Sequence, residues 1–268
     1  MHGLPPAAVE RLARAARSGV RTSLLSAPSA AGIKSVGLEP VGEVMGCVVQ
    51  SMAPRQLTYL PAYSYNIAGI AQPFLDALNT GYATALGRLR EEAKALGADG
   101  VVDIRLSTSD MGSGEEFLAM GTAVRAQSSR RPRSLFTTDL SGGDVAKLMQ
   151  SGWVPVHVEW AGDAHAVYIG ANTQLQTSFY AGNTEVDSYT ALINRVRAGA
   201  RRRFHDMVRS AHADGGIVSD MALSTWKPGE QLVAALAVVY GTAIAQFHAD
   251  GPAPARTLTV MPLRRQGE

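Results

Sequence analysis

The chain has 268 residues, of which 46% are hydrophobic and 18% are charged, and its formal net charge is +2. This composition excludes wholesale disorder, and the even charge balance argues against nucleic acid as an obligate partner. The single cysteine, Cys47, excludes an intrachain disulfide and a zinc site made of cysteines. No stretch approaches the roughly 18 apolar residues of a membrane span, and the N-terminus lacks a secretory signal pattern. We therefore expect a cytoplasmic protein with no membrane span.

The start of the chain predicts an amphipathic helix, to which we assign residues 1–21. Val9, Leu12 and Ala16 recur on one face at helical spacing, and Gly19 ends the pattern. The apolar side is too small for binding to a membrane surface, so docking onto the rest of the protein is the favoured interpretation.

The remainder of the chain contains two copies of the same sequence pattern. Residues 22–100 fall on a second copy, without a gap, when they are shifted forward by 115 positions. Residues 98–100 and 213–215 both read Ala-Asp-Gly at that offset. The Gly-Thr-Ala of residues 121–123 recurs at 241–243, an offset of 120, and small loop insertions produce such drift. A period of this length indicates a domain duplication rather than a solenoid.

We therefore predict an α+β fold made by tandem duplication of a small unit, a sheet with one long helix. A short capped helix precedes each unit. The expected domains are the N-terminal amphipathic helix (1–21), the first repeat (22–126), a polar linker (127–134), the second repeat (135–248) and a C-terminal tail (249–268).

Each repeat opens with its short helix, for which Ser26 and Ser141 are the N-cap candidates. A strand follows at residues 38–49 and again at 153–160, where alternation indicates one buried face. The next stretches, 51–72 and 161–185, are irregular. They hold aromatic residues for which ordinary packing is favoured over an interface or pocket wall: Tyr59, Tyr63, Tyr65, Tyr168, Phe179 and Tyr180.

The long helix of each repeat comes next, at residues 72–96 and 187–211, with Gly81 as a point where the first could break. Two strands complete each repeat. Asp99-Gly100 and Asp214-Gly215 are predicted to be structural turn residues, the glycine accepting a positive φ and the aspartate capping its own backbone.

Two segments carry a family resemblance: residues 90–110 (REEAKALGADGVVDIRLSTSD) and 117–126 (FLAMGTAVRA). They resemble the YbjQ-like family, whose members are labelled "putative heavy-metal-binding" domains. Residues 46–49 (GCVV) match the family's early strand, and the second copy resembles a diverged member. The resemblance implies two tandem copies of a small α+β unit that assembles through its strands into rings, typically pentamers. It implies no enzyme activity and no cofactor.

The metal label is tested by the donor residues. The first repeat has no histidine. In the second, His157 and His165 could face each other across a hairpin with Glu159 beside them. Asp163 also lies near. His157, Glu159 and His165 are the candidates for a metal site, and the compact spacing of zinc helices is absent. We expect no metal site and no catalytic residues, because Cys47 has no histidine in its own repeat and no Gly-x-Ser-x-Gly elbow occurs. An enzyme, if this is one, would use the same hairpin.

The strongest charge feature is an arginine cluster on the second long helix. Arg195, Arg202 and Arg209 are seven residues apart and share one helical stripe. A solvated face is the favoured interpretation, and the alternatives are a subunit interface paired with carboxylates or an anionic partner.

These observations predict a non-catalytic oligomeric scaffold or binding module. A single unit would expose sheet edges that a neighbouring copy can pair with, so we expect a homo-oligomer, a pentameric ring by resemblance. An unknown protein partner could bind the diverged second copy. The alternative function is a metal-binding or small-ligand-binding sensor that uses the second repeat.

Overall fold

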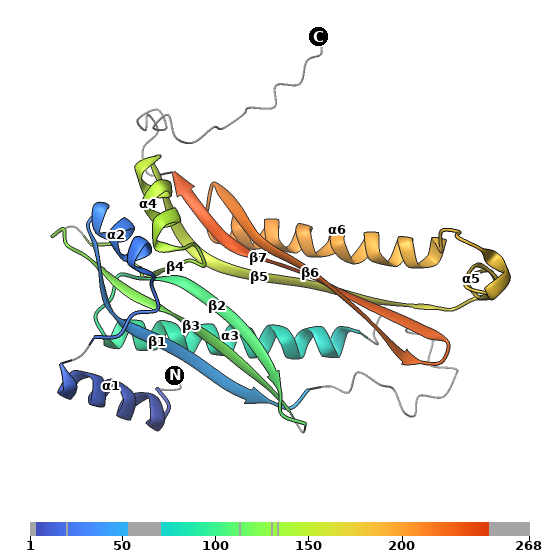
Figure 1. Ribbon diagram of the computed structural model, residues 1–268, viewed down its shortest axis with the longest axis horizontal. Coiled ribbons are helices and arrows are strands. Elements are labelled where there is room, and N and C mark those ends of the chain that lie inside the picture. Colours follow the sequence, from blue (N-terminus) through green and yellow to red (C-terminus); the bar gives the residue numbers. More distant parts are fainter. Residues whose placement is uncertain are drawn as a thin grey trace, which may run out of the picture.

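The computed structural model describes residues 4–19, 21–52, 71–112, 114–129, 131–132 and 134–246. Figure 1 shows two sheets, each accompanied by one long helix. In chain order the elements are α1 (Pro6–Ser18), α2 (Ala27–Ser35), β1 (Leu38–Gln50), α3 (Gln72–Ala95), β2 (Gly100–Asp110), β3 (Glu115–Ala126), β4 (Phe136–Thr137), α4 (Gly142–Gln150), β5 (Trp153–Tyr168), α5 (Ala171–Gln176), the short helix η2 (Phe179–Ala181), α6 (Asp187–Ser210), β6 (Gly215–Gly229) and β7 (Leu232–Gln246).

The two repeats have the same sheet topology. The first sheet has the order β1-β3-β2-β4 and the second has the order β5-β7-β6. In each, the closing strand of the repeat lies between the other two long strands and pairs with both in the antiparallel sense. The fourth strand of the first sheet, β4, comes from the start of the second repeat.

The predicted duplication is confirmed element by element. Helices α3 and α6 both have 24 residues, and their first residues, Gln72 and Asp187, lie 115 positions apart. The ladder of β1 with β3 shifts register at Pro40, and the ladder of β5 with β7 shifts at the matching Pro155. Below, residues that hold the same place in these aligned elements are called equivalents.

Equivalent side chains also make equivalent contacts. Arg88 of α3 donates to the carbonyl of Cys47, and Arg203 of α6 donates to the carbonyl of Gly162, the equivalent strand position. Each arginine therefore ties its long helix to the edge strand of its own sheet.

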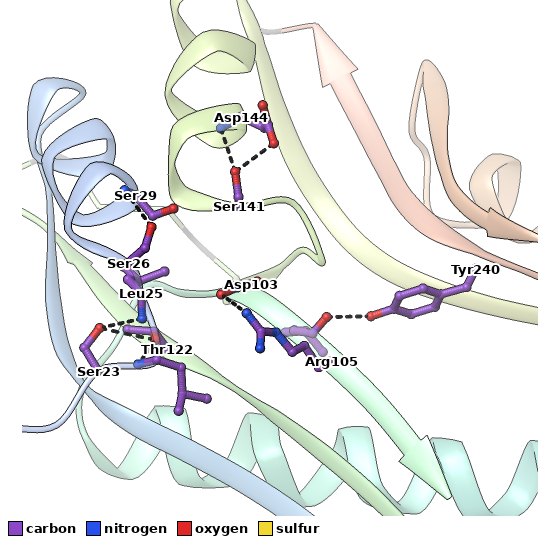
Figure 2. Close-up of polar contacts among 12 residues, drawn as sticks. Ser23, Leu25, Ser26, Ser29, Asp103, Arg105, Thr122, Ser141, Asp144 and Tyr240 are labelled. Carbon is purple, nitrogen blue, oxygen red and sulfur yellow. Dashed lines mark hydrogen bonds and ion pairs between the residues drawn. The ribbon is translucent and has the colours of Figure 1, made fainter.

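The short helices are capped as predicted. The Ser26 hydroxyl accepts the amide of Ser29 at 3.3 Å, and the Ser141 hydroxyl accepts the amide of Asp144 at 3.2 Å. These bonds satisfy backbone donors that the first turn of a helix leaves free. Figure 2 shows the two caps at the starts of α2 and α4.

The molecule is layered in the order first sheet, α3, second sheet, α6. Alternate residues of β7 divide between the two helices, because successive strand side chains point to opposite faces. Ala237 and Val239 pack in the cluster of α6, whereas Leu236 and Tyr240 pack with α3. The second sheet is thus covered on both faces, and α3 is shared between the two repeats.

Several boundaries differ from the sequence prediction. Strand β5 does not end at residue 160 but runs to Tyr168, paired with β7 along its whole length. Helix α3 is unbroken at Gly81, which is glycine because a Cβ there would lie 2.5 Å from the Phe117 ring. Positive φ occurs at Gly97 and His212, at the helix ends, rather than in the Asp-Gly turns.

Other predictions concern residues that the structure does not describe. Tyr59, Tyr63 and Tyr65 lie outside the described residues, as does the tail from residue 249. No described helix is long and apolar enough to cross a membrane.

Candidate functional site

The candidate site is the joint between the two repeats, where β4 joins the sheet of the first repeat. Phe136 pairs with Gly100, and Thr137 pairs with Val101, in the parallel sense. The Phe136 amide donates to the Asp99 carbonyl at 3.1 Å, and the Thr138 amide donates to the Val101 carbonyl at 2.9 Å. The second repeat therefore covers the edge of the first sheet with its own backbone.

The same segment continues to bind β2 beyond the two-residue strand. The Ile104 amide donates to the Thr138 carbonyl at 3.1 Å, and the Asp103 amide donates to the Leu140 carbonyl at 3.0 Å. Gly100 is glycine because a Cβ there would lie 2.2 Å from the Phe136 ring. Residues 136–140 thus fill the edge of β2 with both backbone and side chain.

A tyrosine from β7 adds a polar contact across the joint. The Tyr240 hydroxyl donates to the Ile104 carbonyl at 2.9 Å, as Figure 2 shows beside Asp103 and Arg105. Burial raises the pKa of the Tyr240 phenol well above its ordinary value, and the negative charges of Asp139 and Asp103 raise it further. The phenol therefore stays protonated and acts as a donor.

The threonine of each Gly-Thr-Ala motif holds the segment that leads into its repeat. The Thr122 hydroxyl accepts the Leu24 amide at 3.0 Å, and the Thr242 hydroxyl accepts the equivalent Asp139 amide at 3.2 Å. Figure 2 shows Thr122 with its partners. Both leading segments are therefore positioned in the same way, but among the described residues that of the second repeat alone has a strand beside it.

The large contact of the joint is apolar. Tyr82 of α3 lies against Trp160 of β5 with ring centroids 4.8 Å apart, and Phe74 lies against Trp226 of β6 at 5.5 Å. The short helices add a close approach, because a Cβ on Gly142 would lie 2.4 Å from the Ser29 carbonyl oxygen. Helices α2 and α4 therefore touch backbone to backbone.

The equivalents of the joint, which lie before α2 and on β6, are not covered by any residue that the structure describes. Thr137 and Thr138 are fully buried, whereas Thr22, the equivalent of Thr137, and its neighbour Ser23 are exposed. Val101 is fully buried, whereas its equivalent Gly216 is exposed. Within the described part of the chain, the segment before α2 and the outer edge of β6 therefore have no strand partner, although the other edge of β6 pairs with β7.

The exposed side of β6 is apolar and hollowed. Val218, Met221 and Leu223 are 48%, 39% and 36% exposed. A hollow of about 510 Å³ lies between β6 and α6, and Phe204, Val208 and Gly216 line it. An uncovered edge strand with apolar side chains is a surface that proteins normally cover with a partner.

A second hollow, of about 580 Å³, lies between α3, β5 and α6. Arg90 and Glu159 line it, and the Arg90 Nε is buried with no hydrogen-bond partner in the described part of the chain. Burial lowers the pKa of Arg90 and raises the pKa of Glu159, and each charge opposes the effect on the other. The hollow could hold a small anion on Arg90.

The hairpin that could have brought the two histidines together is not formed. His157, Glu159 and His165 all lie on β5, with no turn between them. Eight residues of strand separate the two histidines by about 26 Å, so they cannot share an ion. His165 instead contacts Asp163, with Nε2 and Oδ2 3.3 Å apart, and burial lowers the pKa of His157.

No group of three or more metal-binding side chains occurs among the described residues. The Cys47 thiol donates to the Glu116 carboxylate at 3.1 Å, and burial raises the pKa of this thiol. This pair supplies too few donors for a metal centre. The described residues therefore do not fit a heavy-metal site.

The sequence also singled out three arginines of the second long helix and the two aspartates that precede β2 and β6. Arg195, Arg202 and Arg209 are exposed on α6. The Asp99 carboxylate accepts the Ala126 amide at 2.8 Å, and the equivalent Asp214 carboxylate accepts the Gln246 amide at 2.9 Å. The two aspartates thus bind the closing strand rather than their own turn.

Sequence reasoning did not find Phe136 or Tyr240. The recurrence of Gly-Thr-Ala shows that Thr122 and Thr242 are equivalent residues, but it carries no information about which segment their hydroxyls bind. A sequence signal for Phe136 does exist: its equivalent in the first repeat is Arg21, so the two copies differ at this position.

A family model described as "Putative heavy-metal-binding" matches residues 33–127. The chain is similar to an encapsulin nanocompartment protein of Mycobacterium tuberculosis, with 29% identity over 268 residues, 95% of this chain and 92% of that protein. It is also similar to a UPF0145 protein of Thermosipho africanus, with 34% identity over 93 residues, 34% of this chain and 85% of that protein. A UPF0145 protein of Clostridium novyi is 33% identical over 89 residues, 33% of this chain and 85% of that protein. No solved structure matches the chain.

Proposed function

Because the chain belongs to the YbjQ-like, or UPF0145, family, we propose that it is a non-catalytic scaffold whose copies join head to tail. The observation that carries the proposal is the pairing of β4 with β2. The leading segment of one repeat covers the sheet edge of the other, and the equivalent segment (residues 21–25) and the equivalent edge of β6 have no strand partner among the residues that the structure describes. Residues 21–25 of one chain fit β6 of the next.

The register of this contact follows from the joint within the chain. Thr22 is the equivalent of Thr137 and Gly216 is the equivalent of Val101, so Thr22 pairs with Gly216 of the neighbouring copy. A contact between two different surfaces of the same protein is heterologous and closes into a ring when its rotation permits. Five chains, the count that the family resemblance implies, would give ten units.

The full-length relative supplies a setting for the ring. That protein is named for a nanocompartment, and it matches this chain across both repeats. We therefore place the scaffold in a protein compartment in the cytoplasm, as a structural component with no enzyme activity, cofactor or nucleic acid of its own. Negative-stain electron microscopy of the purified protein distinguishes separate rings from closed shells.

Mass photometry of a matched pair of variants tests the assembly. Met221→Asp places a charge on the exposed edge strand, and Leu175→Asp makes the same change on α5, at a side chain 68% exposed. We expect the wild type and Leu175→Asp to form the same multimers, and Met221→Asp to dissociate. Multimers that survive in Met221→Asp would contradict the β6 contact.

The alternative function, a sensor of a metal or small ligand, predicts a different result. Its observation is the hollow beside Arg90 and Glu159. A wild-type chain that stays at its 28.3 kDa monomer mass and changes only when zinc or inorganic phosphate is added would favour the sensor.

A further inference from the structure

If copies join head to tail as proposed above, the forces that hold one chain to the next follow from the joint within the chain. Within the chain, the outer side of α3 packs on the second sheet. At the joint between chains, the equivalent contact places the outer side of α6 on the outer face of the first sheet of the neighbouring copy. The residues on both sides of these two joints can be compared position by position.

Inside the chain this contact is apolar. Tyr82 and Leu86 of α3 belong to one buried cluster with Val158 and Leu236 of the second sheet. Leu86, Val158 and Leu236 are at most 7% exposed. Such a joint is stabilised by removal of apolar surface from water and depends little on salt.

On α6 both helix positions carry a positive charge. Arg197 is the equivalent of Tyr82, and Arg201 is the equivalent of Leu86. Both arginines are exposed, and they line a hollow of about 360 Å³ together with Met221 and Leu223 of β6. They lie on the side of α6 that faces the uncovered strand, unlike Arg195 and Arg202.

On the first sheet both strand positions carry a negative charge. Glu43 of β1 is the equivalent of Val158, and Glu116 of β3 is the equivalent of Leu236. Both are half-buried on a face that also holds Met45, Leu118 and Met120. The one cation of β2 on this face, Arg105, is already paired with Asp103 at 3.1 Å. No other cation of β2 lies on this face. Within the same chain, Glu116 accepts the Cys47 thiol at 3.1 Å and Glu43 lines a hollow with Arg11 and Arg21.

We propose that Arg197 and Arg201 of one chain bind Glu43 and Glu116 of the next, so that copies are joined by charge. At the joint between chains, charged residues stand in place of the apolar residues on both sides of the contact. The charges are positive on α6 and negative on the first sheet. Charged joints also set specificity, because α6 cannot replace α3 on the apolar second sheet without burying unpaired arginines. The intrachain joint is permanent and the interchain joint responds to salt.

The short helices agree with a weaker joint between chains. Gly32 and Gly142 allow α2 and α4 to touch, but their equivalents are Lys147 and Ala27. The backbone-to-backbone approach is therefore peculiar to the joint inside the chain, and charge and strand pairing remain to hold the copies together.

Charge reversal with rescue tests the proposal. Arg197→Glu with Arg201→Glu should weaken assembly at least tenfold in sedimentation velocity at low salt. Adding Glu43→Arg and Glu116→Arg to the same chain should restore it to within about threefold. The matched control, Arg195→Glu with Arg202→Glu, makes the same charge change outside the joint and should assemble like the wild type.

Two outcomes would overturn the proposal: undiminished assembly of the Arg197→Glu, Arg201→Glu chain, or equal loss in the control. If circular dichroism shows that the four-substitution chain is unfolded, the wild type decides instead. Its assembly should weaken about tenfold between 50 and 500 mM sodium chloride, and an unchanged dissociation constant would contradict the charged joint. A wild type that is monomeric at both salt concentrations would refute the proposed function itself.

Discussion

Tyr82 of the first repeat and Trp160 of the second lie against each other with ring centroids 4.8 Å apart. Tyr82 also meets Phe117 of its own sheet edge to face, at 5.1 Å. This tyrosine therefore links the cores of the two repeats. The consequence is that the repeats are expected to unfold together rather than one after the other.

Removal of the tryptophan should destabilise the whole chain. Trp160 is 9% exposed, and truncation of a buried aromatic side chain costs about 3–5 kcal/mol of unfolding free energy. Trp160→Ala should show this loss in chemical denaturation followed by circular dichroism. Phe179→Ala removes an aromatic side chain that is 96% exposed and should unfold like the wild type. Two separate transitions in the wild type would contradict a shared core.

Two glycines allow a matched test of close packing. A Cβ at Gly46 would lie 1.8 Å from the Ala85 carbonyl oxygen, so Gly46→Ala must push α3 from β1 and should cost about 1–3 kcal/mol or more. Gly87 of α3 has no atom within 4 Å of such a Cβ. Gly87→Ala should instead stabilise the helix by about 0.5–1 kcal/mol. Equal melting temperatures for the two variants would contradict the close approach of α3 to β1 at Gly46.

The fold was largely predictable from the sequence because it depends on local patterns. Helical spacing, serine caps and the 115-residue repeat fix the elements of each unit. The long strand β5 was missed because Ala161-Gly162-Asp163 reads as a turn, yet Gly162 is needed where Leu75 would lie 2.7 Å from a Cβ. That contact comes from the other repeat, so no local pattern could reveal it.

The joint was less predictable than the elements for a similar reason. Arg197 and Arg201 stand in the same run of sequence as Arg195 and Arg202, and only the packing of α6 separates the four. Likewise, Glu43 and Glu116 are distant in sequence and are brought to one face by the pairing of β1 with β3. A sequence pattern predicts the helix or strand on which a residue lies. The residues that it contacts on another element can be identified only from the structure.

The raised pKa of Tyr240 predicts a loss of stability in alkali. The unfolded phenol ionises near its ordinary pKa of 10.0, whereas the folded phenol stays protonated to higher pH. Stability is therefore fully present below about pH 10 and falls as the pH rises toward the folded pKa. The unfolding free energy of Tyr240→Phe should be lower by about 0.5–1.5 kcal/mol at pH 8 and should fall less steeply above pH 10. Parallel pH profiles for the two proteins would contradict this role.

Arg11 holds the N-terminal helix to the first repeat. It pairs with Glu92, which is 1% exposed and whose other oxygen accepts the Met45 amide at 2.8 Å. Arg11→Ala should increase hydrogen exchange across residues 6–18, because it removes the partner of a buried carboxylate. Arg14→Ala, an exposed position on the same helix, is the control. Equal exchange in both variants would mean that other contacts hold α1.

The most direct measurement of head-to-tail assembly is a disulfide across the joint between chains. Thr137 and Val101 are strand partners within the chain, so their equivalents, Thr22 and Gly216, should be partners between chains. In a Cys47→Ser background, Thr22→Cys with Gly216→Cys should give covalent multimers on a non-reducing gel after mild oxidation. The pair Thr22→Cys with Thr225→Cys should not. A single band at 28.3 kDa for the first pair, under conditions where the protein is concentrated and folded, would contradict head-to-tail pairing of Thr22 with Gly216.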